Sequence, residues 1–266
     1  MEKKGKNPKI PTDNARRTSP EKVIGILDLF EEEHLRWTPE QMMERLQCPR
    51  STLYRYLRVL TTAGLVTSLP DTGYTLGPRI VELDYMMRSS DPLITNGRPL
   101  LQALVKEIAG IGLLCRYYKD RVLCVHQETS ASEIHSSYER GRAMPIAVGA
   151  TSRVILAHLN LPQLRQLYAQ QSSEFSRKKI DKSLDELQEN LREIRKLGYC
   201  LSRGEVTPGV VGIAAPVFDS EDTIIGSLSM VVSETGFNER RRRINIDRIT
   251  FSARVLTNSM RPLDFA

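Results

Sequence analysis

The first part of the chain carries apolar residues at helical spacing, interrupted by helix-start and turn signals. Residues Ser19–Phe30 repeat apolar positions three and four apart behind a Ser-Pro start, which predicts a helix with one apolar face. Thr38–Leu46 opens with the form of a capping box and predicts a second, short helix. After a break at Gln47–Pro49, a third helix is expected to run to residue 62 or 63. Gly64 then stands where a left-handed C-terminal cap is favoured.

Two short β-prone runs follow the third helix. Leu65–Thr67 and Tyr74–Leu76 flank Pro70–Gly73, a turn-forming tip, and this pattern predicts a β-hairpin. Three helices followed by a hairpin, over residues 19–78, have the element order of a winged helix-turn-helix. Residues 1–18 hold almost nothing that could be buried and are interpreted as a disordered basic arm.

The pattern changes after the hairpin. Arg79–Arg88 has helical spacing and is interpreted as a linker helix within residues 79–91. Beyond it, the sequence predicts helices at 100–108, 151–159, 163–170 and 180–197 and after Asn238, and strands at 113–118, 122–125, 210–217 and 224–232. The second domain, residues 92–266, is therefore expected to be of the α+β class, a sheet flanked by helices.

Composition adds a few limits. The 266 residues are 40% hydrophobic, with neither a membrane-spanning run nor the apolar core of a signal peptide, so a cytoplasmic location is expected. The net charge of +6 permits nucleic-acid binding without requiring it. The four cysteines and four histidines are scattered, so neither a metal site nor a cofactor is expected. No GxSxG, GxGxxG or GxxxxGK motif occurs, and the chain is not expected to be an enzyme.

The third predicted helix has two distinct faces. At about 100° per residue, Leu53, Leu57 and Leu60 share one side, which predicts the buried face. The opposite side carries hydroxyl and arginine groups that suit phosphates and base edges in a DNA major groove. The candidate DNA contacts are therefore Arg50, Ser51, Thr52, Tyr54, Arg55 and Arg58 on this helix, Thr38 before it, and Thr72, Gly73 and Tyr74 in the hairpin. The Arg240–Arg243 run is interpreted as a solvated face that does not contact DNA.

Several motifs along the chain match one family in the expected order. Pro49–Arg55, Ala63–Val66 and Tyr74–Gly77 resemble the DNA-binding domain of IclR-type transcriptional regulators. The resemblance continues in Arg140–Pro145, Leu197–Tyr199, Gly209–Asp219 and Ser227–Ser229. It implies a GAF-like second domain that binds a small-molecule effector. It also implies a homodimer or tetramer that binds a double-stranded DNA operator of two-fold symmetry.

The resemblance also implies positions for the effector pocket. These are Ala150, Thr151, Ser202, Gly212, Ser229 and Val231. The chain departs from the family's acid-binding pattern at Ser202, Gly212 and Val231, and Ser152-Arg153 replaces the usual Gly-Lys. Fewer polar groups and more space suggest a larger or more apolar ligand than a small keto acid. The effector is therefore expected to be an organic or aromatic acid of a catabolic pathway.

Two other classes of protein remain open at this stage. An enzyme with an appended DNA-binding domain would need a nucleophile with its base, a metal cluster or a phosphate loop, and the sequence shows none of these. A ligand-independent DNA-binding protein would leave a large second domain without a task. A DNA mobility shift that responds to metabolites separates the regulator from both alternatives.

Overall fold

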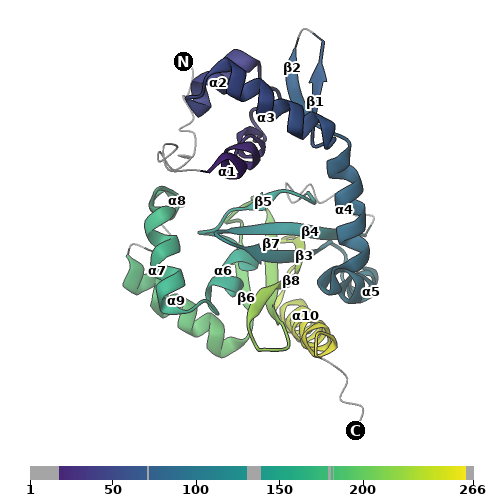
Figure 1. The fold of residues 1–266 in the computed structure, drawn as a ribbon. Helices are drawn as coiled ribbons and strands as arrows, with labels where there is room; N and C mark the ends of the chain where they lie inside the picture. Colours follow the sequence, from purple (N-terminus) through teal and green to yellow (C-terminus); the bar gives the residue numbers. More distant parts are fainter. Residues whose placement is uncertain (1–17, 71, 131–138, 179–180, 182, 262–266) are drawn as a thin grey trace. The chain divides into compact units, whose positions relative to one another are not determined.

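The computed structural model describes residues 18–70, 72–130, 139–178, 181 and 183–261. The chain divides into two compact units, Met1–Arg88 and Ser89–Ala266. The arm expected over residues 1–18 lies outside the described residues except for Thr18. Figure 1 shows the helices and strands of both units.

The first unit has the predicted order of three helical segments and a hairpin (Figure 1). Its elements are α1 (Ser19–Ile24), a 3₁₀ turn (Leu27–Leu29), α2 (Pro39–Leu46), α3 (Arg50–Thr62), β1 (Val66–Leu69) and β2 (Gly73–Leu76). The capping box at Thr38 and the left-handed Gly64, with φ of +72°, are confirmed. The winged helix-turn-helix is therefore present.

The first helix is shorter than predicted. A single helix over Ser19–Phe30 is wrong, because α1 ends at Ile24 and a 3₁₀ turn follows. Gly25 stands at the break, where its freedom weakens a helix. The N-cap is Thr18 and not Ser19, and the Thr18 N–H donates to the Glu21 carboxylate at 2.6 Å. A 3₁₀ turn also brings residues three apart to one side, so the apolar face survives the break.

The core of the first unit lies beneath α3. Leu53, Leu57 and Leu60 are buried there, as the sequence predicts. The Trp37 indole N–H donates to the Leu29 carbonyl at 2.9 Å, which fixes the ring inside this core. The Trp37 backbone also exchanges hydrogen bonds of 2.8 and 3.0 Å with Tyr74, so it extends the hairpin by one more bridge. The hairpin is thereby tied to the helices.

The predicted linker helix is present as α4 (Arg79–Ser90). None of its residues is buried within the described structure. Val81, Tyr85 and Met87 are exposed by 69%, 66% and 48%, which is a large apolar surface for one helix.

The second unit is built on a six-stranded antiparallel sheet with strand order β5-β4-β3-β8-β7-β6. Its elements are α5 (Pro92–Glu107), β3 (Ile111–Tyr118), β4 (Arg121–Thr129), β5 (Ala143–Met144), α6 (Ala150–Leu156), α7 (Leu161–Gln170), α8 (Ser172–Lys178), α9 (Leu184–Leu197), β6 (Cys200–Arg203), β7 (Val210–Phe218), β8 (Ile224–Ser233) and α10 (Glu239–Ser259). The α+β arrangement is therefore as predicted.

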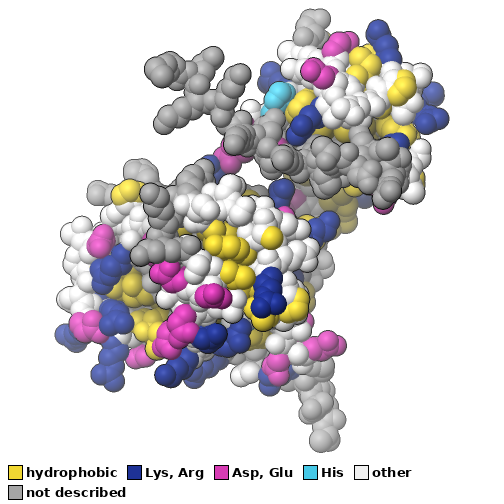
Figure 2. Space-filling model, turned by 90° about the vertical axis from the view of Figure 1, so that its left-hand side faces the viewer, with side chains coloured by type: hydrophobic (Ala, Val, Ile, Leu, Met, Phe, Trp, Pro, Cys, Tyr) yellow, Lys and Arg dark blue, Asp and Glu magenta, His cyan; other side chains and the backbone are white. Residues whose placement is uncertain are grey.

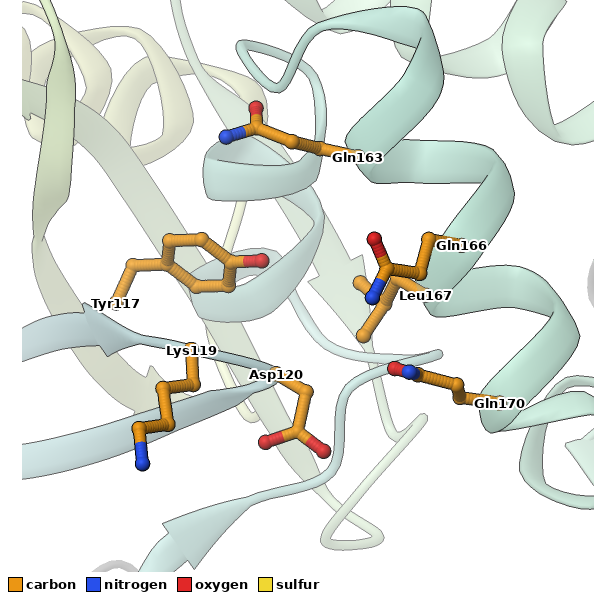
Figure 3. A pocket seen from close by; sticks show the side chains of 7 residues that line it. All are labelled: Tyr117, Lys119, Asp120, Gln163, Gln166, Leu167 and Gln170. Atoms are coloured by element: carbon orange, nitrogen blue, oxygen red, sulfur yellow. The ribbon is translucent and has the colours of Figure 1, made fainter.

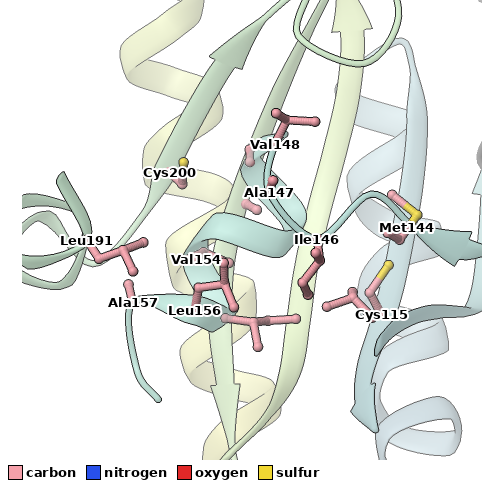
Figure 4. Close-up of a cluster of buried hydrophobic side chains, with 14 of the residues drawn as sticks. Cys115, Met144, Ile146, Ala147, Val148, Val154, Leu156, Ala157, Leu191 and Cys200 are labelled. Carbon is pink, nitrogen blue, oxygen red and sulfur yellow. The ribbon is translucent and has the colours of Figure 1, made fainter. Parts of the chain in front are cut away.

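The sheet separates two apolar cores. Along β7, Val211, Ile213 and Ala215 pack on the side of α5 and α10, whereas Ala214 packs on the side of α6. This alternation is the period of two that a strand imposes. Figure 4 shows the second core, where residues that precede and form α6 meet those of β3 and α9. The α6 start is thus held between the sheet and α9.

Some boundaries and short elements differ from the prediction. The helix predicted at 180–197 begins at Leu184, because Ser183 caps it and accepts the Glu186 N–H at 3.2 Å. The helix predicted at 100–108 begins earlier, at Pro92, behind the N-cap Asp91. The sequence pattern missed β5, β6 and α8. These elements are too short for a hydrophobic period to be recognised in them.

Candidate functional site

The outward face of α3 is polar and accessible. Arg50, Ser51, Tyr54, Arg55 and Arg58 are exposed, and Thr52 is half-buried. The guanidinium carbon of Arg50 lies 5.5 Å from the centre of the Tyr54 ring, and that of Arg55 lies 5.4 Å from the Tyr56 ring. These cation–π contacts support the arginine side chains while leaving their donor groups at the surface.

Three of the remaining predicted DNA contacts, Thr38, Gly73 and Tyr74, also have structural roles in the first unit. The Thr38 hydroxyl accepts the Gln41 N–H at 3.3 Å, so it caps α2. Gly73 has a φ of +94°, and a Cβ there would lie 2.3 Å from the Trp37 carbonyl oxygen. Tyr74 packs against the core of the first unit. Thr72 is exposed beside the hairpin tip.

Five of the six predicted effector residues line one pocket in the second unit. Ala150, Thr151, Ser202, Gly212 and Val231 share it with the loop between β6 and β7 and with Val210. The sixth, Ser229, lies beside it, with its hydroxyl 3.2 Å from that of Thr151. The pocket encloses about 10 Å³, which is room for about one water molecule. The described conformation is therefore closed.

Two backbone donors at the start of α6 already have partners in the closed pocket. The Ala150 N–H donates to the Ser202 hydroxyl at 3.0 Å, and the Gly149 N–H donates to the Glu205 carboxylate at 2.8 Å. A ligand carboxylate needs such donors, since charge-assisted hydrogen bonds are what hold it. In the described structure both of these donors are therefore already occupied by acceptors of the protein.

The sequence reasoning missed the loop that closes the pocket. Glu205, Val206 and Thr207 line it, between Gly204 and Gly209, whose φ angles are +61° and +76°. The Thr207 hydroxyl is buried without a hydrogen-bond partner in the described structure. The two glycines that bracket the loop were the available signal, because they mark backbone that turns sharply.

Arg153, which replaces the usual lysine, does not point into the pocket. It is buried against Asp181, with nitrogen–oxygen distances of 2.6 and 3.3 Å. Burial opposes its charge, but the hydrogen bond and the charge of Asp181 outweigh this and raise the pKa of Arg153. Asn190 donates to the same carboxylate at 2.6 Å. The pocket lining therefore carries one carboxylate, Glu205, and no cation.

Other kinds of site find no support in the described residues. Within the described ranges, no group of three His, Cys, Asp or Glu side chains lies close enough to hold a metal ion. None of the helices described here combines the length and the apolar character that crossing a bilayer requires.

Comparison with known proteins decides the family. Residues 19–70 match the IclR helix-turn-helix domain, and residues 87–257 match the domain described as "Bacterial transcriptional regulator IclR C-terminal". The chain belongs to the IclR family of transcriptional regulators. It is therefore a DNA-binding regulator with an effector-binding C-terminal domain, in a family of regulators and not of enzymes.

The relatives agree with this assignment. The chain is 27% identical over 247 residues to the HTH-type transcriptional regulator KdgR of Escherichia coli strain K12, covering 90% of this chain and 91% of KdgR. It is 22% identical over 214 residues to the Pca regulon regulatory protein of Pseudomonas putida, covering 80% of this chain and 73% of that protein.

Two solved structures have the same fold. An IclR homolog of Microbacterium hydrocarbonoxydans complexed with 4-hydroxybenzoate has a TM-score of 0.72 at 19% identity, covering 91% of this chain and 99% of that one. An IclR transcriptional regulator of Alicyclobacillus acidocaldarius has a TM-score of 0.74 at 20% identity, covering 91% of this chain and 98% of that one.

Proposed function

We propose that this IclR-family regulator binds a specific operator through the outward face of α3 and releases or engages it in response to a small acid bound in the α6 pocket. The observation that carries the proposal is the separation of faces on α3. Its leucines are buried while Arg50, Ser51, Arg55 and Arg58 face solvent, inside a helix-turn-helix domain of this family.

The proposed roles of the α3 residues follow from their chemistry. The guanidinium groups of Arg55 and Arg58 suit the two acceptors on a guanine edge. Arg50, Ser51 and Thr52 lie in the first turn, where side chains and backbone amides suit a phosphate. Tyr54 and the capping residue Thr38 are proposed backbone contacts, together with Thr72, Gly73 and Tyr74 of the wing.

The proposed effector is an organic or aromatic acid of a catabolic pathway. Its carboxylate would accept the Ala150 N–H in place of the Ser202 hydroxyl. The ring would lie against Val231 and over Gly212, which has no side chain of its own. Because the closed pocket holds about 10 Å³, the loop over residues 204–209 must move outward to admit such a ligand. The 4-hydroxybenzoate complex of the Microbacterium relative supports an aromatic acid as the ligand.

The proposed domain plan is an arm at 1–18, a DNA-binding domain at 19–78, a linker helix at 79–91 and an effector-binding domain at 92–266. We propose a homodimer or tetramer, because two copies present two recognition helices to a two-fold operator. The exposed apolar residues of α4 support pairing of the chain with another copy.

In this proposal α4 transmits the effector state by changing the distance between the recognition helices. Spin-label distances that are identical with and without effector would contradict that step.

The experiment is a mobility shift on the DNA upstream of the regulator's own gene and its neighbours. The expected result is a specific shift whose midpoint changes when an aromatic acid such as 4-hydroxybenzoate is added. A parallel thermal-denaturation screen compares aromatic acids with glyoxylate and pyruvate. Stabilisation by the small keto acids alone would overturn the aromatic assignment. A shift that no metabolite alters would favour the ligand-independent alternative.

A further inference from the structure

A second, larger cavity lies in the same unit, away from the residues of the α6 pocket. It is a groove of about 510 Å³ between the turn that joins β3 to β4 and one face of α7. The turn contributes Tyr117, Lys119 and Asp120, and the helix contributes Gln163, Gln166, Leu167 and Gln170 (Figure 3). Cavities of about 300–1,000 Å³ are typical of small-molecule sites.

The helix side of the groove is a row of amides. Gln163, Gln166 and Gln170 stand at positions i, i+3 and i+7 of α7 and so share one face. The side-chain Oε1 of Gln163 accepts the Asn160 backbone N–H at 3.2 Å, which leaves the side-chain amide hydrogens of Gln163 for a ligand. Within the described residues, the Gln166 and Gln170 side chains make no hydrogen bond. The groove therefore offers several donors and acceptors that the protein does not use itself.

The hairpin side adds one carboxylate and one phenol. Figure 3 shows the Tyr117 hydroxyl directed toward α7 and the Lys119 ammonium directed away from it. The Lys119 nitrogen lies 5.3 Å from the centre of the Tyr118 ring, which is consistent with this orientation. Burial, and then the charge of Asp120, raise the pKa of Tyr117, so its hydroxyl stays protonated. The Asp120 carboxylate therefore lies nearer to the glutamine row than the Lys119 ammonium, although both residues line the groove.

The apolar lining of the groove and the charges on the surrounding surface also limit which ligands fit it. The apolar part of the lining comes chiefly from the Tyr117 ring, because Leu167 also lines the groove but is exposed by only 2%. Figure 2 shows acidic and basic side chains interspersed on the face of the second unit that carries α7 and α9, with no field of one sign. Among the described residues that line the groove, Lys119 is the one cation and Asp120 the one carboxylate, so the lining has no net charge.

We infer that this groove is a second ligand site, which binds a neutral sugar. Ring hydroxyls are both donors and acceptors, as the glutamine amides and the Tyr117 hydroxyl are, and they can donate to Asp120. The C–H face of a sugar ring suits the apolar lining that comes chiefly from Tyr117. An acid would meet the charge of Asp120, and a purely apolar ligand would bury the amides without partners, which is costly. The inference concerns residues that the proposed effector pocket does not share.

The test is titration calorimetry of the full chain with D-glucose, D-galactose and D-xylose as probes. At least one is expected to bind saturably, and the uronic acid of a hexose that binds is expected to bind more weakly. Gln166→Ala with Gln170→Ala removes two exposed amides and is expected to weaken sugar binding about tenfold or more, as the loss of two hydrogen bonds predicts. Gln188→Ala, on α9 outside the groove, is the matched control and is expected to leave binding unchanged.

Two further variants separate this site from the effector pocket and test the charge. Gly212→Val fills the effector pocket, since a Cβ at Gly212 lies 3.0 Å from the Ser202 hydroxyl, and is expected to leave sugar binding intact. Asp120→Asn is expected to reduce the preference for sugar over uronic acid. The inference is overturned if none of the three sugars binds, if the double glutamine variant binds as wild type does, if Gly212→Val abolishes binding, or if uronic acids bind as tightly as sugars.

Discussion

The Glu205 carboxylate accepts a hydrogen bond of 2.8 Å from the backbone N–H of Gly149, 56 residues earlier in the chain. The bond joins the loop between β6 and β7 to the residue that precedes α6. Gly149 has a φ of +85° and is followed by Ala150, whose N–H is held by Ser202. Two side chains, Ser202 and Glu205, thus satisfy the backbone donors at the start of α6 and hold the loop against it.

Glu205→Ala is expected to lower the free energy of unfolding by about 1–3 kcal/mol, the cost of losing a hydrogen bond to a charged group. Urea denaturation of the ligand-free protein measures it. Glu205→Gln keeps a carbonyl acceptor and should lose less. Glu221→Ala, in the exposed turn between β7 and β8, is the control and should change stability little. Equal urea midpoints for Glu205→Ala and the wild type would show that the loop is held in another way.

Ser202→Ala removes the acceptor of the Ala150 N–H. The ligand-free protein should lose about 1–2 kcal/mol, because a buried donor is left without a partner. A carboxylate effector supplies the missing acceptor, so 4-hydroxybenzoate should raise the melting temperature more in this variant than in the wild type. Ser229→Ala, which keeps the bond between Ala150 and Ser202, should not show this increase. A smaller ligand-induced rise in Ser202→Ala would contradict the proposed carboxylate position.

Arg55→Ala is expected to weaken operator binding by about 1–3 kcal/mol and to relax base preference at one position of each half-site. A mobility shift with the operator and with single-base variants measures both effects. Arg165→Ala on α7 makes the same change of charge outside the helix-turn-helix and should leave binding nearly unchanged. If Arg55→Ala also binds normally, the arginine only covers Tyr56 on the helix surface.

Asp181→Ala should destabilise the second unit by about 3–5 kcal/mol, because it leaves the buried Arg153 charge without its partner. The two side chains are exposed by only 6% and 2%. Replacing both, as Arg153→Met with Asp181→Leu, should recover most of the loss. The measurement is urea denaturation of the three proteins. A double variant that is as unstable as Asp181→Ala would show that the pair has a role beyond neutralising its own charges.

His158 is expected to make the protein less stable in mild acid. Burial, and then the charge of Arg195, lower the pKa of His158 from 6.5 to about 4, and the ring packs edge-on against Phe218 at 4.9 Å. Above pH 6.5 His158 is neutral in both the folded and the unfolded chain, so it does not change the free energy of unfolding there. As the pH falls from 6.5 toward about 4, the unfolded chain binds a proton that the folded protein excludes, so the free energy of unfolding decreases.

The comparison of the wild type with His158→Leu isolates this contribution from the titration of carboxylates. Urea denaturation at pH 7 and at pH 5 should show a smaller decrease for the variant. An equal decrease in both proteins would mean that His158 is protonated in the folded state at pH 5.

Local patterns were sufficient for the first unit. The apolar stripe of Leu53, Leu57 and Leu60, the capping box at Thr38 and the hairpin of β1 and β2 each involve residues close together in the sequence, and each was predicted correctly. The first helix was an exception, because periodicity does not distinguish an α-helix from a 3₁₀ turn that brings residues to the same side. The positions implied by the family resemblance also came together around one pocket.

The contacts that define the sites could not be read from the sequence. Arg153 and Asp181 are 28 residues apart, Gly149 and Glu205 are 56 apart, and Thr151 and Ser229 are 78 apart. Nothing in the local pattern marks Glu205 as the carboxylate that closes the pocket, or Gln166 and Gln170 as neighbours of the hairpin turn at Asp120.

The sequence by itself determined the two kinds of domain, the buried and polar faces of α3 and the family to which the chain belongs. These depend on short-range periodicity and on motifs, which a sequence states directly. The tertiary structure decided which distant side chains meet. It joined the Glu205 carboxylate to the Gly149 N–H, paired Arg153 with Asp181 outside the lining of the α6 pocket and set a row of glutamines opposite Asp120. Such pairings arise only when the sheet brings separate segments together, because hydrogen bonds and ion pairs act over a few ångströms of space and not along the chain.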